Sequence, residues 1–176
     1  MMDTSTIGYS WSGNTISSLF QPYALNGSEN TSRFFAITSA LFYCLSLSFV
    51  FVTIAKNSAS LLHQSIIKTA GIGSMVYAFL IVTPMHNLMV NIALAFYVVA
   101  VFTLLHSLYV LKLRGLVVFG VCCIALPLFN AVLYYFDVLS ALLPAIQKLG
   151  LFACVIWFLV IYYFQSSTSK KVINQA

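Results

Sequence analysis

Charged residues are scarce in this chain of 176 residues, which has eight lysines and arginines, three acidic residues and a formal net charge of +5. They make up 6% of the sequence, against about a quarter in an ordinary soluble domain. Hydrophobic residues make up 61%. This composition excludes a soluble enzyme and a disordered tail. It also excludes a nucleic-acid partner, because so few basic residues spread over an apolar chain cannot line a DNA groove.

Motifs that carry known chemistry are also missing. The sequence has no P-loop, no GxSxG, no HExxH and no glycine-rich dinucleotide-binding turn. No apolar run holds an Asp, Glu, Lys or Arg near its middle, which argues against an ion-coupled pump. The four cysteines lie in apolar runs without CxxC or zinc-ligand spacing; they are Cys44, Cys122, Cys123 and Cys154. We therefore predict no disulfide, no metal site and no cofactor.

Long apolar runs are what the sequence does contain. A membrane-spanning helix needs about 20 mainly apolar residues. Five candidates occur, at 34–55, 69–85, 88–111, 115–136 and about 144–164. The second is short, so we expect its helix to begin before Lys68. Because the runs are continuously apolar rather than alternating, helices are favoured over barrel strands. The sequence predicts an all-α integral membrane bundle of five transmembrane helices.

The basic residues are distributed unevenly between the two sides of this five-span chain. One side holds Lys56, Lys68, Lys112, Arg114, Lys170 and Lys171. The other side holds Arg33 and Lys148 with the three acidic residues, Asp3, Glu29 and Asp137. The positive-inside rule makes the first side cytoplasmic. We expect an extracytoplasmic N-terminal segment at 1–33, a membrane domain at 34–165 and a cytoplasmic tail at 166–176. The expected location is the bacterial cytoplasmic (inner) membrane.

Aromatic and small residues mark the ends and the contacts of the expected helices. Tyr134-Tyr135-Phe136 and Tyr162-Tyr163-Phe164 close two runs, as is typical of membrane interfaces. Small residues recur at every fourth position of the first two runs; they are Ala36, Ala40, Cys44, Ser48, Ala70, Ser74 and Ala78. Such stripes let helix backbones approach closely. They serve either the bundle itself or a homo-oligomer.

Polar side chains gather near the expected outer ends of the last three helices. They are His86, Asn87 and Asn91 on the third run, Asn130, Tyr134 and Asp137 on the fourth, and Gln147 and Lys148 on the fifth. One interpretation is a ligand-binding pocket at head-group level, in which Lys148 holds a lipid phosphate as a point charge. The other is hydrogen bonding between helices. Pro127 frees a backbone carbonyl near Asn130, and its kink either widens this pocket or only shapes the helix.

Three functions are compatible with these residues. The leading one is a non-enzymatic membrane protein whose outer polar pocket contacts a membrane lipid or a membrane-protein partner. The second is a membrane-embedded lipid-modifying enzyme in which His86 and Asp137 act as an acid–base pair. The third is an accessory subunit of a membrane complex or a small-solute permeation protein.

The histidines do not form a convincing haem site. A haem held by two histidines needs ligands on facing helices at matched depth. His86 and His106 lie at opposite ends of one expected helix and cannot do this. The pair of His63 and His106 is the poorer remaining alternative, because His63 is expected in the loop between the first two helices. The sequence therefore predicts no haem.

The order of features resembles the DRAM-like and Sfk-like multi-span membrane proteins, in particular their bacterial relatives of unassigned function. The similar segments are Ile7-Gly8-Tyr9 with Ser12-Gly13-Asn14, then Thr83-Pro84-Met85-His86, and residues 144–148 before the last span. Such relatives usually have six spans, the first of them before the glycine segment. We find no counterpart of that span, and expect either its loss or a true start upstream. The eukaryotic relatives are associated with autophagy regulation and with lipid remodelling of GPI anchors, so the resemblance implies lipid handling.

Overall fold

The computed structural model describes residues 9–24, 27–58 and 60–173, with side chains up to residue 165. Its long helices are α1 (Arg33–Ala55), α2 (Leu61–Phe79), α3 (His86–Val110), α4 (Arg114–Phe136) and α5 (Leu143–Ile173). Three short 3-10 turns accompany them: η1 (Ile16–Phe20), η2 (Leu80–Val82) and η3 (Ser140–Leu142). All five long helices are long and apolar enough to cross a membrane. Apart from one isolated bridge between Tyr23 and Glu29, the regular structure of the described chain is helical, which confirms the predicted all-α class.

The start of α2 shows how a local signal extends a helix beyond its apolar run. The side chain of Ser60 accepts a hydrogen bond from the backbone N–H of His63, which is the usual role of an N-cap serine. The helix therefore begins at Leu61, well before Lys68, as expected. His63 lies in its first turn, so the expected position of His63 in a loop is wrong.

The last helix also outlasts its apolar run. It begins with Leu143 and Pro144, and a proline in the first turn has no intrahelical N–H to lose. It continues to Ile173, beyond the expected end at residue 164. Neither Gly nor Pro follows Phe164 to stop the helix. Residues 166–173 of the expected tail are thus helical, and residues 174–176 lie outside the described part.

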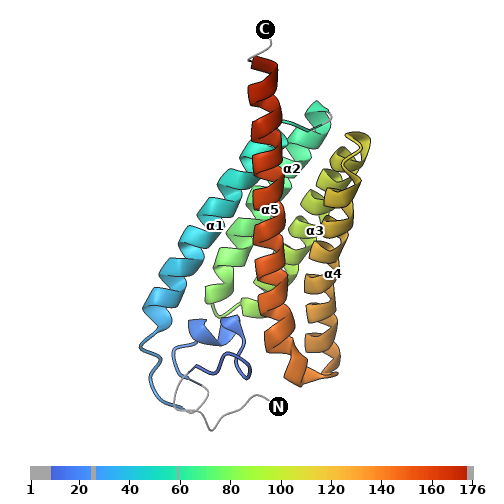
Figure 1. The fold of residues 1–176 in the computed structure, drawn as a ribbon. Helices are drawn as coiled ribbons and strands as arrows, with labels where there is room; N and C mark the ends of the chain where they lie inside the picture. The colour runs from blue at the N-terminus through green and yellow to red at the C-terminus, as the bar shows by residue number, and fades with distance from the viewer. Residues whose placement is uncertain (1–8, 25–26, 59, 174–176) are drawn as a thin grey trace.

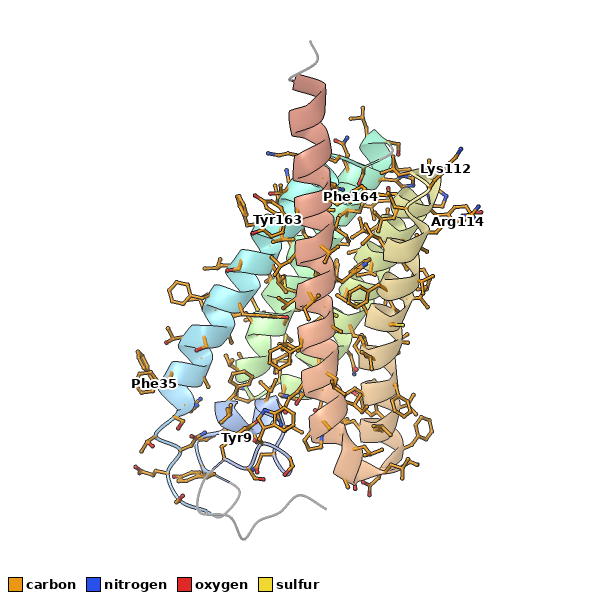
Figure 2. All side chains as sticks on the ribbon, in the orientation of Figure 1. Tyr9, Phe35, Lys112, Arg114, Tyr163 and Phe164 are labelled. Carbon is orange, nitrogen blue, oxygen red and sulfur yellow. The ribbon has the colours of Figure 1, made fainter. Side chains whose placement is uncertain are left out.

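The helices lie side by side, and each neighbour in sequence is a neighbour in space (Figure 1). The α2–α3 and α3–α4 pairs are antiparallel hairpins (Figure 1), and α1 also contacts α5. Residues 9–24 and 27–32, here called the N-terminal segment, lie against one end of the bundle, away from the C-terminus (Figure 1). We call this the capped end. Lys112 and Arg114 mark the other, basic end, far from Tyr9 and Phe35 (Figure 2).

Small residues allow the helices to pack closely inside the bundle. Ala70 and Ser74 of the predicted stripe on α2 are buried. Gly71 lies against α1, where an added Cβ would stand 2.4 Å from the ring of the fully buried Phe51. The α2 stripe therefore serves contacts within the chain, because close approach of this kind needs side chains that are nearly absent.

Candidate functional site

Four of the predicted site residues form a hydrogen-bonded strip between α3 and α4 near the capped end. The Tyr134 hydroxyl donates to Oδ1 of Asn87 over 3.1 Å, and Nδ1 of His86 lies 3.1 Å from the same oxygen. The Tyr135 hydroxyl donates to Oδ1 of Asn91 over 2.8 Å. Except for half-buried His86, these side chains are exposed on the surface of the bundle. Their geometry is that of hydrogen bonds joining two helices.

Asp137 lies apart from this strip. The helix ends at Phe136, and Asp137 is its C-cap in the left-handed region, with φ of 50°. The side chain is exposed. Within the described residues, no hydrogen bond or ion pair joins Asp137 to His86. The acid–base pair considered from the sequence is therefore not assembled in this structure.

Lys148 is buried beneath the N-terminal segment, with 3% of its surface exposed. Its Nζ donates to the carbonyl oxygen of Trp11 and, over 2.7 Å, to that of Asn14. The same atom lies 5.3 Å from the ring centroid of Tyr9 and 5.0 Å from that of Trp11. Cations favour such positions over aromatic rings. The ammonium is thus held by the chain's own carbonyls and rings rather than presented outward to a phosphate.

The loop that accepts the hydrogen bonds of Lys148 is stabilised by hydrogen bonds of its own. Oδ1 of Asn14 accepts from the backbone N–H of Ser10 over 3.0 Å, and the Asn14 N–H donates to the Ser10 carbonyl over 2.9 Å. Oε1 of Gln147 accepts from the backbone N–H of Ile16 over 2.8 Å, which fixes the segment to α5. Desolvation raises the pKa of the Tyr9 hydroxyl, which donates to the Asn14 carbonyl. Ile7 and Gly8 of the resembling motif lie outside the described residues.

A central pocket of about 230 Å³ lies between the five helices, near the level of Asn130. Its lining is mostly apolar and comes from every long helix: Tyr43, Leu47, Ser74, Met75, Ala78, Ala93, Leu94, Tyr97, Pro127, Asn130, Ile146, Gln147, Gly150, Leu151, Cys154 and Phe158. Of the eight predicted site residues, Asn130 and Gln147 line this pocket. Oδ1 of Asn130 is buried and has no hydrogen-bond partner in the described structure.

Pro127 shapes one wall of the pocket. A proline within a helix leaves the carbonyl four residues earlier without its usual N–H donor, and here that carbonyl belongs to Cys123. The Tyr97 hydroxyl of α3 donates to it over 3.1 Å, and the Cys154 thiol of α5 approaches it to 3.6 Å. The freed carbonyl is therefore satisfied across helices. Tyr97 was missed from the sequence, although a proline in an apolar run signals that some donor must meet the freed carbonyl.

We expect Tyr97→Phe to lower the free energy of unfolding by about 1–2 kcal/mol, because the buried Cys123 carbonyl would keep only a weak thiol donor. Tyr109→Phe is the matched control, since Tyr109 lies on the same helix with its side chain 66% exposed. Melting temperatures of the two variants in one detergent measure the difference. An equal response of both would show that the hydroxyl of Tyr97 adds nothing to the α3–α4 contact.

The two histidines at the basic end meet face to edge. His63 on α2 and His106 on α3 have ring centroids 5.0 Å apart and an interplanar angle of 62°. They lie on facing helices, contrary to the expectation for His63, but the touching rings leave no space for a porphyrin between them. Among the described residues, no group of three or more His, Cys, Asp or Glu side chains is placed to hold a metal ion.

Comparison of the chain with protein families, curated proteins and solved structures found no match.

Proposed function

We propose that this chain is a non-enzymatic integral membrane protein that binds an amphipathic, lipid-like molecule in the central pocket. The observation that carries the proposal is a mostly apolar pocket, lined by all five helices, whose lining includes Asn130, a residue with a buried amide oxygen that has no partner among the described residues. Leaving such a group unpaired costs about 1–3 kcal/mol. A ligand that fills the apolar space and pairs with the Asn130 amide would remove this penalty.

The size of the pocket limits what it can accept. Pockets for drug-sized ligands usually measure about 300–1,000 Å³, and an apolar cavity of about 150 Å³ can hold benzene. A volume of about 230 Å³ lies between these values. By proportion to benzene it takes about nine non-hydrogen atoms, which is a polar group with a short chain, or the polar end of a longer lipid.

The distribution of charge supports the proposed orientation. We propose that the basic end, with Lys112 and Arg114, faces the cytoplasm and that the capped end lies outside, since basic loops are retained on the cytoplasmic side. This places the Asn130 amide in the outer half of the bilayer. We propose the bacterial cytoplasmic membrane as the location, with membrane lipids as the first partners and a homo-oligomer or a membrane-protein partner as further ones.

Quenching of tryptophan fluorescence tests the binding. The chain has two tryptophans, so Trp11→Phe leaves Trp157, whose ring centroid lies 5.1 Å from that of the pocket residue Phe158. In lipid nanodiscs, a hexanol brominated at the chain end is expected to quench Trp157 in a saturable manner. Ala93→Leu fills the pocket and should abolish saturation.

Ala125→Leu supplies the matched control, because Ala125 is exposed on the surface of α4. It should bind the brominated hexanol like the parent protein. Quenching that rises linearly with probe and is the same in all three proteins would mean that the probe acts from the lipid, and the proposed function would then be wrong.

A further inference from the structure

The pocket that the proposed function uses has no charged lining. Within the described part of the chain, no Asp, Glu, Lys, Arg or His contributes to it, and its polar side chains are hydroxyls, amides and one thiol. An ionised group that enters a low-dielectric site without a counter-charge carries a large desolvation penalty. Both anionic and cationic head groups are therefore disfavoured at this position.

The ammonium of Lys148, one candidate for a counter-charge, already has partners. Lys148 follows the lining residue Gln147, but its Nζ donates to the carbonyls of Trp11 and Asn14 and lies over two aromatic rings. Turning the ammonium toward the pocket would break these contacts, and the Trp11 carbonyl would lose its donor while the Asn14 carbonyl would keep only the Tyr9 hydroxyl. A carboxylate or phosphate in the pocket therefore gains nothing from Lys148.

Most of the polar lining is also satisfied within the chain. Ser74 donates to the Gly71 carbonyl over 2.7 Å, Tyr97 donates to the Cys123 carbonyl, and Gln147 accepts from Ile16. Tyr43 offers a further neutral hydroxyl in the lining. The buried Oδ1 of Asn130 has no hydrogen-bond partner among the described residues. This oxygen needs a hydrogen-bond donor, and because the amide is neutral it cannot balance a positive charge on that donor.

Resting on the proposed function, we infer that the ligand is a neutral, hydroxyl-bearing amphiphile, with its hydroxyl at Asn130 and its hydrocarbon chain along the apolar wall. A hydroxyl both donates and accepts, so it can pair with either end of the amide. A charged carboxylate offers only acceptors and an ammonium only donors, and each would also bring an uncompensated charge into the pocket.

Four brominated probes of equal chain length test this inference in the Trp11→Phe protein in nanodiscs at neutral pH. They are bromohexanol, bromohexanoic acid, bromohexylamine and bromohexane, each with bromine at a chain end. Saturable quenching of Trp157 is expected for the alcohol at a concentration in the lipid about tenfold lower than for the other three. Asn130→Leu should remove the advantage of the alcohol over bromohexane.

The melting temperature distinguishes a ligand-binding amide from a structural one. Without probe, Asn130→Leu should melt higher than the parent, because an unpaired buried amide is replaced by an apolar side chain of similar size. Asn87→Leu is the control: it removes an exposed amide that is hydrogen-bonded to Tyr134, and it should keep the alcohol preference and not melt higher. A lower melting temperature for Asn130→Leu would contradict the inference.

The four probes also test the inference in the protein that keeps Asn130. If no probe quenches in a saturable manner, both the inference and the proposed function fail. If the acid or the amine saturates at the same concentration as the alcohol or below it, the pocket is a binding site but its ligand is charged, and the inference alone is overturned.

Discussion

Replacement of Lys148 by methionine is expected to release the N-terminal segment from the capped end of the bundle. Two hydrogen bonds from a charged ammonium to the carbonyls of Trp11 and Asn14 would be lost, each worth about 1.5–3 kcal/mol. The contacts with the rings of Tyr9 and Trp11 add about 0.5–2 kcal/mol each. Relief of the ammonium's desolvation offsets part of this sum. We expect a net loss of about 2–4 kcal/mol.

Two measurements follow the consequence of Lys148→Met. The melting temperature in detergent should fall, and a protease added to the folded protein should cut within the N-terminal segment faster than in the parent. The segment keeps its link from Ile16 to Gln147, so residues 9–15 should be cut before residues beyond η1. Lys68→Met is the control, because Lys68 is exposed on α2 toward the basic end.

An unchanged cleavage pattern in Lys148→Met would show that the ammonium does not hold the segment. Lys148→Arg separates charge from shape. The guanidinium keeps the positive charge and the donors, but it is larger and planar. It should restore part of the melting temperature and not all of it, since the site was built around a compact ammonium beneath two rings.

The five helices could be predicted because their apolar runs are long and uninterrupted, so the cost of exposing backbone polar groups to lipid decides their structure. Which side of each helix faces the core of the bundle could not be predicted in the same way. Spans that are apolar all the way round carry no hydrophobic stripe that distinguishes lipid from core, although the small residues of α2 indicated a buried face. Asn130 and Tyr134 are four residues apart, and residues four apart on a helix differ by about 40° in direction. In the structure Asn130 lines the pocket, while Tyr134 reaches Asn87 on the exposed side.

Contacts between segments that are distant in the sequence could not be predicted either. The charge of Lys148 at the start of a span was interpreted as a site for an external phosphate, because nothing local indicates that residues 9–14 fold back over it. The position of His63, in contrast, could have been predicted. Ser60 before an apolar pair is an N-cap signal, and it indicates that α2 begins before His63. Tyr135 was assigned only to the interfacial belt, and its bond to Asn91 depends on the rotation of α3 against α4.

Substitution of Gly120 by alanine is expected to destabilise the junction of three helices. A Cβ at this position of α4 would stand 2.3 Å from the Trp157 ring of α5 and 2.5 Å from the Leu105 side chain of α3. Trp157 is fully buried, and its Nε1 donates to the Leu116 carbonyl over 2.8 Å. The indole therefore cannot rotate away without losing its hydrogen bond. Overpacking of this kind costs about 1–3 kcal/mol, and more where the neighbours are fixed.

Gly115→Ala is the matched control on the same helix, since nothing lies within 4 Å of a Cβ built there. Alanine is the better helix former by about 1 kcal/mol, so Gly115→Ala should leave the melting temperature unchanged or raise it, while Gly120→Ala should lower it. In the Trp11→Phe background, a red shift of Trp157 emission in Gly120→Ala would locate the damage at the indole. Equal melting temperatures for the two alanine variants would mean that α3, α4 and α5 do not meet this closely. In that case this junction would not hold the neighbouring pocket residues Cys154 and Phe158 in a fixed position. A pocket with such a loosely held wall would not be expected to prefer one ligand over another.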